Sequence, residues 1–373
     1  MKKLYDYIPN LNKYILTINK NYKNNKFSNS KYIKYKELRV MCKEIAILLE
    51  SGCEIIKLLN MVKEHSSKTA KDALAHISDQ IQRGKTLTQA FQSTQSFSNF
   101  FINTVSAGEV SGCLDRVMES LSSYFDKEYK LRSKIITIMI YPIILIILSF
   151  TSMVFILLFI IPNFQIIFSS NAIEPPLLSK ILIFTSNFLR SNLTILSLIF
   201  IAVLTLLYYL FVYNKWFKNY IDKVKLKLPV TKMLNELIIT TRFSSSLKIL
   251  ISSGVQIIDA IDISAHVVDN KYVYKDISSA NNYIKKGNSI GIALEQVKFF
   301  PELFISMVKA GEESGKLEES LEAANKFYEN ELNIKIEQMI KLLEPVIIII
   351  LGAIIGSSII AMVTPMFEII SSV

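Results

Sequence analysis

Ala107-Gly108-Glu109-Val110-Ser111-Gly112 is a stretch that the chain contains twice. The second copy is Ala310-Gly311-Glu312-Glu313-Ser314-Gly315, 203 residues later. The same spacing relates residues on both sides of the motif, namely Phe101 and Phe304, Leu114 and Leu317, Glu128 and Glu331, and Pro142 and Pro345. A repeat of this length predicts one domain present twice, with each copy leading into a long apolar segment.

The composition is that of a membrane protein. Of the 373 residues 51% are hydrophobic, and the mean hydropathy is +0.34, which is too apolar for a soluble chain. The formal net charge is +10. In a membrane protein this charge is typical of basic cytoplasmic loops and contact with anionic lipid. Because no aromatic-and-basic motif accompanies it, we expect no nucleic-acid partner.

Helical periodicity dominates both copies of the repeat. Apolar residues recur at spacings of three and four over 37–134 and again over 237–342, with almost no alternation of the β type. We therefore predict an all-α membrane protein with two homologous cytoplasmic helical bundles of about six helices each, and three transmembrane helices.

Three apolar stretches predict the transmembrane helices: 135–161, 193–213 and 343–366. Pro142 and Pro345 stand where the first and third stretches enter the membrane, a position at which proline is tolerated. Basic residues cluster before the first stretch and after the second, so both bundles are expected in the cytoplasm. The remaining segments are a basic N-terminal arm (1–36), an extracytoplasmic connector (162–192), a basic juxtamembrane segment (214–236) and a short extracytoplasmic tail (367–373).

Gly352 and Gly356 form a small-xxx-small pair in the third stretch. Such a pair lets two helices approach closely. Two interpretations are open: contact between copies of the chain, or packing against the other two transmembrane helices.

The repeated Gly-Glu-x-Ser-Gly motif predicts a tight turn between two helices, with Gly108 and Gly112 in the first copy and Gly311 and Gly315 in the second. Ser111 and Ser314 are expected to cap the helix that follows. Glu109 and Glu312 either accept hydrogen bonds from loop amides or face a partner. Asp115 and Glu318 fall in the first turn of the next helix, where the helix dipole favours acids.

The sequence contains no recognisable catalytic, metal or cofactor site. Gly84-Lys85-Thr86 resembles the end of a phosphate loop, but that motif requires a glycine at position 79, which is Asp79. Gly84 and Gly287 are better interpreted as helix stops, with Thr86 and Ser289 capping the next helix. The cysteines Cys42, Cys53 and Cys113 are predicted to be free thiols. We expect no enzymatic activity.

Each copy has four features in the same order: a Ser-Gly near its start, a Gly-x-[Ser/Thr]-[Leu/Ile] turn, the Gly-Glu-x-Ser-Gly motif and a proline at the membrane boundary. In this combination the chain resembles the type II secretion F / type IV pilus PilC family. This family comprises platform proteins of the inner (cytoplasmic) membrane and includes the competence-pseudopilus platform. The resemblance covers about residues 38 to 370. The first copy departs from the pattern, since it has Phe97-Ser98 where the second has Phe299-Phe300-Pro301.

The resemblance implies a multi-pass, non-enzymatic platform that couples a hexameric assembly or secretion ATPase to the insertion of pilins or pseudopilins into a filament. Its other implied partners are further inner-membrane components of the machine, membrane lipids and further copies of the chain, as a dimer or larger oligomer. Whether the machine is a type IV pilus, a type II secretion system or a competence filament is left open. The alternative is a small membrane transporter or channel subunit, which requires polar residues inside the transmembrane helices.

Overall fold

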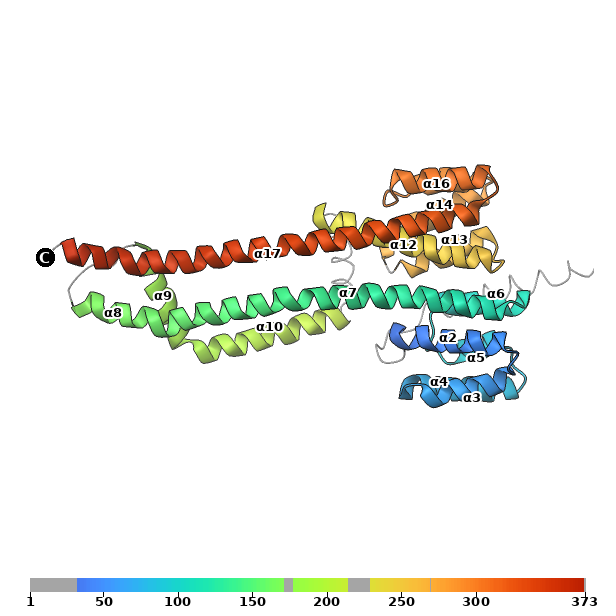
Figure 1. Cartoon of the computed structure of the whole chain (residues 1–373), viewed down its shortest axis with the longest axis horizontal. Coiled ribbons are helices and arrows are strands. Elements are labelled where there is room, and N and C mark those ends of the chain that lie inside the picture. The colour runs from blue at the N-terminus through green and yellow to red at the C-terminus, as the bar shows by residue number, and fades with distance from the viewer. Residues whose placement is uncertain (1–31, 171–176, 214–228, 269, 372–373) are drawn as a thin grey trace, which may run out of the picture.

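The computed structural model describes residues 32–170, 177–213, 229–268 and 270–371, and these ranges contain helices and no strand. Two helical bundles lie together at one end of an elongated molecule, and two long helices, α7 and α17, extend side by side away from them (Figure 1). Most of the predicted N-terminal arm and juxtamembrane segment, part of the connector and the last two residues lie outside the described residues.

The N-terminal bundle is formed by five short helices and the first part of a long one: α2 (Tyr35–Glu50), α3 (Ile55–His65), α4 (Lys68–Gln82), α5 (Leu87–Ser93), α6 (Asn99–Ser111) and α7 (Leu114–Phe155). Its core is aromatic. The ring of Phe101 lies 5.0 Å from that of Phe91 and 6.4 Å from that of Phe125, measured between centroids. These side chains are almost fully buried, so they supply a large share of the hydrophobic free energy of the bundle.

The C-terminal bundle repeats this order with α12 (Pro229–Ser252), α13 (Ile257–Val267), α14 (Lys271–Lys285), α15 (Ile290–Glu295), α16 (Glu302–Glu313) and the first part of α17 (Leu317–Ser371). Phe304 takes the place of Phe101 and packs edge-on against Phe243 and Tyr328. The bundle begins earlier than the expected residue 237, because α12 starts at Pro229. Proline suits the first position of a helix, where its missing N–H group is not needed.

The predicted helix stops and caps before α5 and α15 are confirmed. Gly84 and Gly287 have φ angles of 83° and 92°, in the left-handed region that glycine adopts without strain. The hydroxyl of Thr86 then accepts a hydrogen bond from the backbone N–H of Gln89, and Ser289 does the same for Ile292.

The departure of the first copy at Ser98 has a local explanation. Ser98 is the N-cap of α6, and its side chain accepts a hydrogen bond from the N–H of Phe101. Pro301 is the N-cap of α16 and makes no such bond. The two residues therefore begin equivalent helices by different means, a capping hydroxyl in one copy and a fixed φ angle in the other.

Both bundles continue without a break into long apolar helices. α7 passes through Pro142 and is followed by a π-helical turn (η2, Ile156–Ile160) and by α8 (Ile161–Ser170). α17 has 55 residues and passes through Pro345, so its length is about 80 Å at ~1.5 Å per residue. Most apolar side chains on the distal parts of both helices are exposed, as expected for surfaces that face lipid.

The second predicted transmembrane segment has a different form. α10 (Leu193–Tyr213) joins α9 (Leu177–Ser191) at an angle of 78°. By length and composition, the described residues contain two helices that can cross a membrane, or three if this bent pair is one span. The hydroxyl of Ser186 on α9 donates a hydrogen bond to the carbonyl of Leu157 in η2, which binds α9 to the first long helix.

The three cysteines differ in accessibility. Cys42 is fully buried in the N-terminal bundle, whereas Cys53 and Cys113 are half-buried, and all three are free thiols as predicted. Burial raises the pKa of the Cys42 thiol well above its ordinary value, and the reactive species is the thiolate. We expect a maleimide to modify Cys53 and Cys113 in the folded protein and Cys42 only after unfolding, as measured by mass spectrometry. Rapid native modification of Cys42 would contradict this packing.

Candidate functional site: the repeated turns and the interface between the bundles

The acid of the first repeated turn binds the start of a neighbouring helix. The carboxylate of Glu109, near the end of α6, accepts hydrogen bonds from the backbone N–H groups of Leu87 (2.7 Å) and Thr88 (2.9 Å) and from the Thr88 hydroxyl (2.5 Å). Leu87 and Thr88 are the first two residues of α5. Their N–H groups have no acceptor within the helix, and the positive end of the helix dipole favours an anion there.

The acid of the second turn makes the same contacts. The carboxylate of Glu312 accepts hydrogen bonds from the N–H groups of Ile290 (2.7 Å) and Gly291 (2.9 Å), the first two residues of α15. Of the two interpretations left open by the sequence, these contacts support hydrogen bonding to loop and helix amides. Both glutamates therefore tie the penultimate helix of their bundle to the short helix that precedes it.

The prediction for the two serines is wrong. The hydroxyls of Ser111 and Ser314 donate hydrogen bonds to the carbonyls of Ala107 and Ala310, one turn back in the preceding helix. They do not cap α7 or α17. The reason is that Ser111 is the last residue of α6 and Ser314 is the C-cap of α16. The left-handed residues Gly112 and Gly315, with φ angles of 71° and 70°, follow only after the serines. Each serine therefore still belongs to the end of its helix, where its hydroxyl satisfies a backbone carbonyl.

The remaining two glycines of the motif allow close packing. A Cβ atom at Gly108 would lie 2.8 Å from a methyl carbon of Val117, and one at Gly311 would lie 2.5 Å from the Cβ of Ser320. Gly108 and Gly311 thus let α6 and α16 lie directly against the long helices, while Gly112 and Gly315 form the turns. The motif fixes the angle at which each long helix leaves its bundle.

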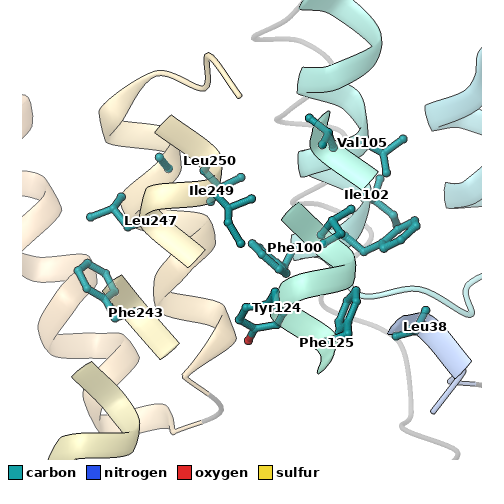
Figure 2. Packing of buried hydrophobic residues seen from close by; sticks show 14 of the residues in the cluster. Leu38, Phe100, Ile102, Val105, Tyr124, Phe125, Phe243, Leu247, Ile249 and Leu250 are labelled. Atoms are coloured by element: carbon teal, nitrogen blue, oxygen red, sulfur yellow. The ribbon is translucent and has the colours of Figure 1, made fainter. Parts of the chain in front are cut away.

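The two bundles meet along α7. Helix α6 contacts α12 and α13, and α7 contacts α12 and α17. Ile249 of α12 points toward Phe100 of α6, beside Tyr124 of α7, and the buried side chains continue from Leu38 in one bundle to Phe243 in the other (Figure 2). One apolar core therefore runs through both bundles.

A buried ion pair crosses this interface. The guanidinium of Arg242 on α12 donates two hydrogen bonds of 2.7 Å to the carboxylate of Glu128 on α7. Both side chains are largely buried. Burial opposes the charge of Arg242, but the carboxylate of Glu128 outweighs it and raises the pKa of Arg242 above its ordinary value. Burial and the same carboxylate raise the pKa of Tyr124, so the phenol is neutral and the guanidinium of Arg242 is charged at neutral pH.

More exposed ion pairs extend the interface toward the long helices. Lys127 and Lys134 of α7 each lie 2.7 Å from an acid of α17, Glu329 and Glu337 respectively. Lys127, Lys134 and Glu329 line a cavity of about 240 Å³ together with the Arg242–Glu128 pair. Pairs this exposed contribute little individually, because water screens their charges. They join α7 to α17 at two points seven residues apart on α7.

The other predicted residues lie on the long helices. Pro142 is buried within α7, and Pro345 is exposed on α17. A Cβ atom at Gly352 or Gly356 would meet no atom of the described structure within 4 Å. Packing of this pair against the other transmembrane helices of the same chain therefore receives no support here, and contact between copies stays a prediction.

Comparison with known proteins identifies the family. The model of the family "Type II secretion system (T2SS), protein F" matches residues 41–162 and, separately, 243–365. The chain belongs to this family. The two matched segments cover most of the two bundles and of the long helices that leave them, and the sequence resemblance is thereby confirmed.

Relatives in this family come from two kinds of machine. The type IV pilus assembly protein PilC of Thermus thermophilus is 33% identical over 90% of this chain and 83% of its own length. The type IV pilus assembly protein TapC of Aeromonas hydrophila is 28% identical, over 90% and 82%. The type II secretion system protein F of Vibrio cholerae is also 28% identical, over 89% and 82%. The chain is therefore a membrane protein of the type II secretion F family with relatives in pilus assembly and in secretion.

Proposed function

We propose that this chain is the inner-membrane platform of a type IV pilus or type II secretion-like machine. It couples a hexameric assembly ATPase to the insertion of pilins or pseudopilins into the filament, and it has no catalytic activity of its own. Both bundles lie in the cytoplasm, where the ATPase reaches them. The basic residues that flank the first two apolar stretches support this orientation.

The observation that carries the proposal is the continuity of each bundle with a long apolar helix. α7 and α17 each begin inside a bundle core and run on through the apolar region without interruption. The Arg242–Glu128 pair and the shared core join the bundles to each other. A displacement imposed on either bundle by an ATPase would therefore move both long helices, and with them any pilin bound at the membrane.

A break in α7 tests this coupling. In a strain that lacks the gene and makes no filaments, the wild-type chain should restore filament assembly. A chain with a short Gly-Ser insertion after Lys134 should not restore it, because the insertion separates the bundle from the apolar part of α7. The same insertion between Ser66 and Ser67, in the loop between α3 and α4, serves as the control and should restore assembly.

Co-purification with the cognate ATPase separates coupling from binding. All three chains should retain the ATPase, since both insertions leave the bundles intact. Full filament assembly by the chain with the α7 insertion would refute mechanical coupling through this helix. Failure of the wild-type chain to bind the ATPase would refute the proposed partner.

A further inference from the structure

The interface between the two bundles joins two different faces. On one side are α6 and α7 of the N-terminal bundle, and on the other α12 and α13 of the C-terminal bundle. In the repeat, α12 and α13 correspond to α2 and α3, and α16 and α17 correspond to α6 and α7. The contact is therefore heterologous, that is, head to tail. The contact covers the α6–α7 face of the N-terminal bundle, whereas the corresponding α16–α17 face of the C-terminal bundle is not part of it. It likewise covers the α12–α13 face, whereas the corresponding face on α2 and α3 is not part of it.

The unoccupied face of the C-terminal bundle, here called the α16–α17 face, consists of Leu303, Phe327, Glu331 and Ile334. Leu303 corresponds to Phe100 of the N-terminal bundle, and Phe327 corresponds to Tyr124. Phe100 and Tyr124 are only 4% and 5% exposed, because α12 covers them. Leu303 and Phe327 are 49% and 43% exposed. Glu331 stands at the position of Glu128, and Ile334 at that of Leu131. The face thus repeats an interface that is buried in the other bundle, but no helix of the described residues covers it.

The unoccupied face of the N-terminal bundle, here called the α2 face, consists of Lys36, Val40, Lys43 and Ile47. These residues are exposed and lie on one side of α2. With the one-residue slip of the repeat, Ile47 corresponds to Ile249, which is 7% exposed in the interface, whereas Ile47 is 52% exposed. Val40 takes the position of Arg242, and lysines flank it on both sides.

We propose that the α16–α17 face of one copy binds the α2 face of a second copy, so that the contact within each chain is repeated between chains. The two faces derive from a pair of surfaces that already pack together in this structure. Apolar residues would again meet apolar residues, with Leu303 and Phe327 against Val40 and Ile47. Glu331 would face Lys36 of α2, whose charge is complementary, while the ammonium of Lys43 stays paired with Glu119 of its own chain.

The membrane region is consistent with this arrangement. Within one chain, the contact of α6 and α7 with the C-terminal bundle places α7 alongside α17. The repeated contact would place α7 of the second copy alongside α17 of the first. Because Gly352 and Gly356 of α17 have no close neighbour among the described residues, this side of the helix is open to another helix. A head-to-tail contact of this kind gives a ring if its rotation closes.

The first test is the oligomeric state of the full-length chain, purified in detergent and measured by mass photometry and sedimentation. The wild-type chain should form dimers or rings. Leu303→Asp should shift it to monomers, because a carboxylate would be buried against apolar side chains. Ile292→Asp is the matched control, because Ile292 is an equally exposed apolar residue of the same bundle, on α15. It should leave the oligomer unchanged.

Cross-linking tests the head-to-tail geometry directly. Ile47→Cys and Leu303→Cys are made separately in a chain whose native cysteines are replaced by alanine. The Ile47→Cys and Leu303→Cys chains are then mixed and treated with a short bismaleimide. A cross-linked dimer should form in the mixture and in neither chain alone, whereas a two-fold symmetric dimer would link like with like.

Three results would overturn the proposal: a monomeric wild-type chain, an oligomer that survives Leu303→Asp, or cross-linking in a single-variant sample. None of these measurements involves an ATPase or a pilin, so the proposal stands or falls independently of the proposed function. Leu303, Ile292 and Ile47 are all exposed, so their substitution should leave the fold intact. Folding of each variant, and of the cysteine-free chain in which the buried Cys42 is also replaced, is checked by its helical circular dichroism.

Discussion

Replacing Arg242 with methionine is expected to destabilise the two-bundle region by about 3–5 kcal/mol, because it leaves the carboxylate of Glu128 buried without its counter-charge. The expectation rests on geometry. Two hydrogen bonds of 2.7 Å join these side chains inside the interface, where both are largely buried. The free energy of unfolding is measured by urea denaturation in detergent, followed by circular dichroism.

Two controls isolate the effect of the unpaired charge. The double variant Glu128→Leu, Arg242→Met removes both charges and should recover most of the lost stability, as apolar replacements of buried ion pairs often do. Lys43→Met breaks the exposed pair between Lys43 and Glu119 and should cost less than about 1 kcal/mol. If Arg242→Met costs no more than Lys43→Met, the pair does not stabilise the interface.

Glu109→Ala is expected to cost about 3 kcal/mol or more of unfolding free energy. Each hydrogen bond to a charged group contributes about 1.5–3 kcal/mol, and Glu109 accepts three of them at the start of α5. Glu312→Ala should cost somewhat less, because Glu312 accepts hydrogen bonds only from the N–H groups of Ile290 and Gly291 among the contacts in this structure. Both values come from the same urea denaturation.

Glu313→Ala is the matched control for these substitutions. Glu313 is adjacent to Glu312 but exposed, so its removal should change stability by less than about 0.5 kcal/mol. Equal effects of Glu312→Ala and Glu313→Ala would show that the repeated acid is a surface charge and not a link between helices.

Much of the architecture could be predicted because it is local in sequence. The helical bundles follow from apolar periodicity, and the caps at Thr86 and Ser289 follow from a hydroxyl placed directly after a glycine stop. The role of the serines in the repeated turn could not be predicted so simply. A serine next to a glycine can end one helix or begin the next, and only the φ angle of the glycine decides between the two.

The ion pair across the interface could not be predicted from the apolar periodicity. Glu128 and Arg242 are 114 residues apart, and no periodicity connects residues on different bundles. The repeat itself conceals the pair, since Arg242 corresponds to Val40 in the first copy. A charge at the position of an apolar residue in the other copy was the one available signal. The two copies differ at this position because α7 covers Arg242 on α12, whereas Val40 on α2 is exposed.

The uninterrupted course of α17 makes it a lever. Its 55 residues extend about 80 Å at ~1.5 Å per residue, so a tilt of about 5° at the bundle would displace the distal end by roughly 7 Å. The proline at position 345 does not break the helix, and most apolar side chains of the distal part are exposed in the described structure. A modest angular motion at one end would thus become a translation at the other that is comparable with the diameter of a side chain.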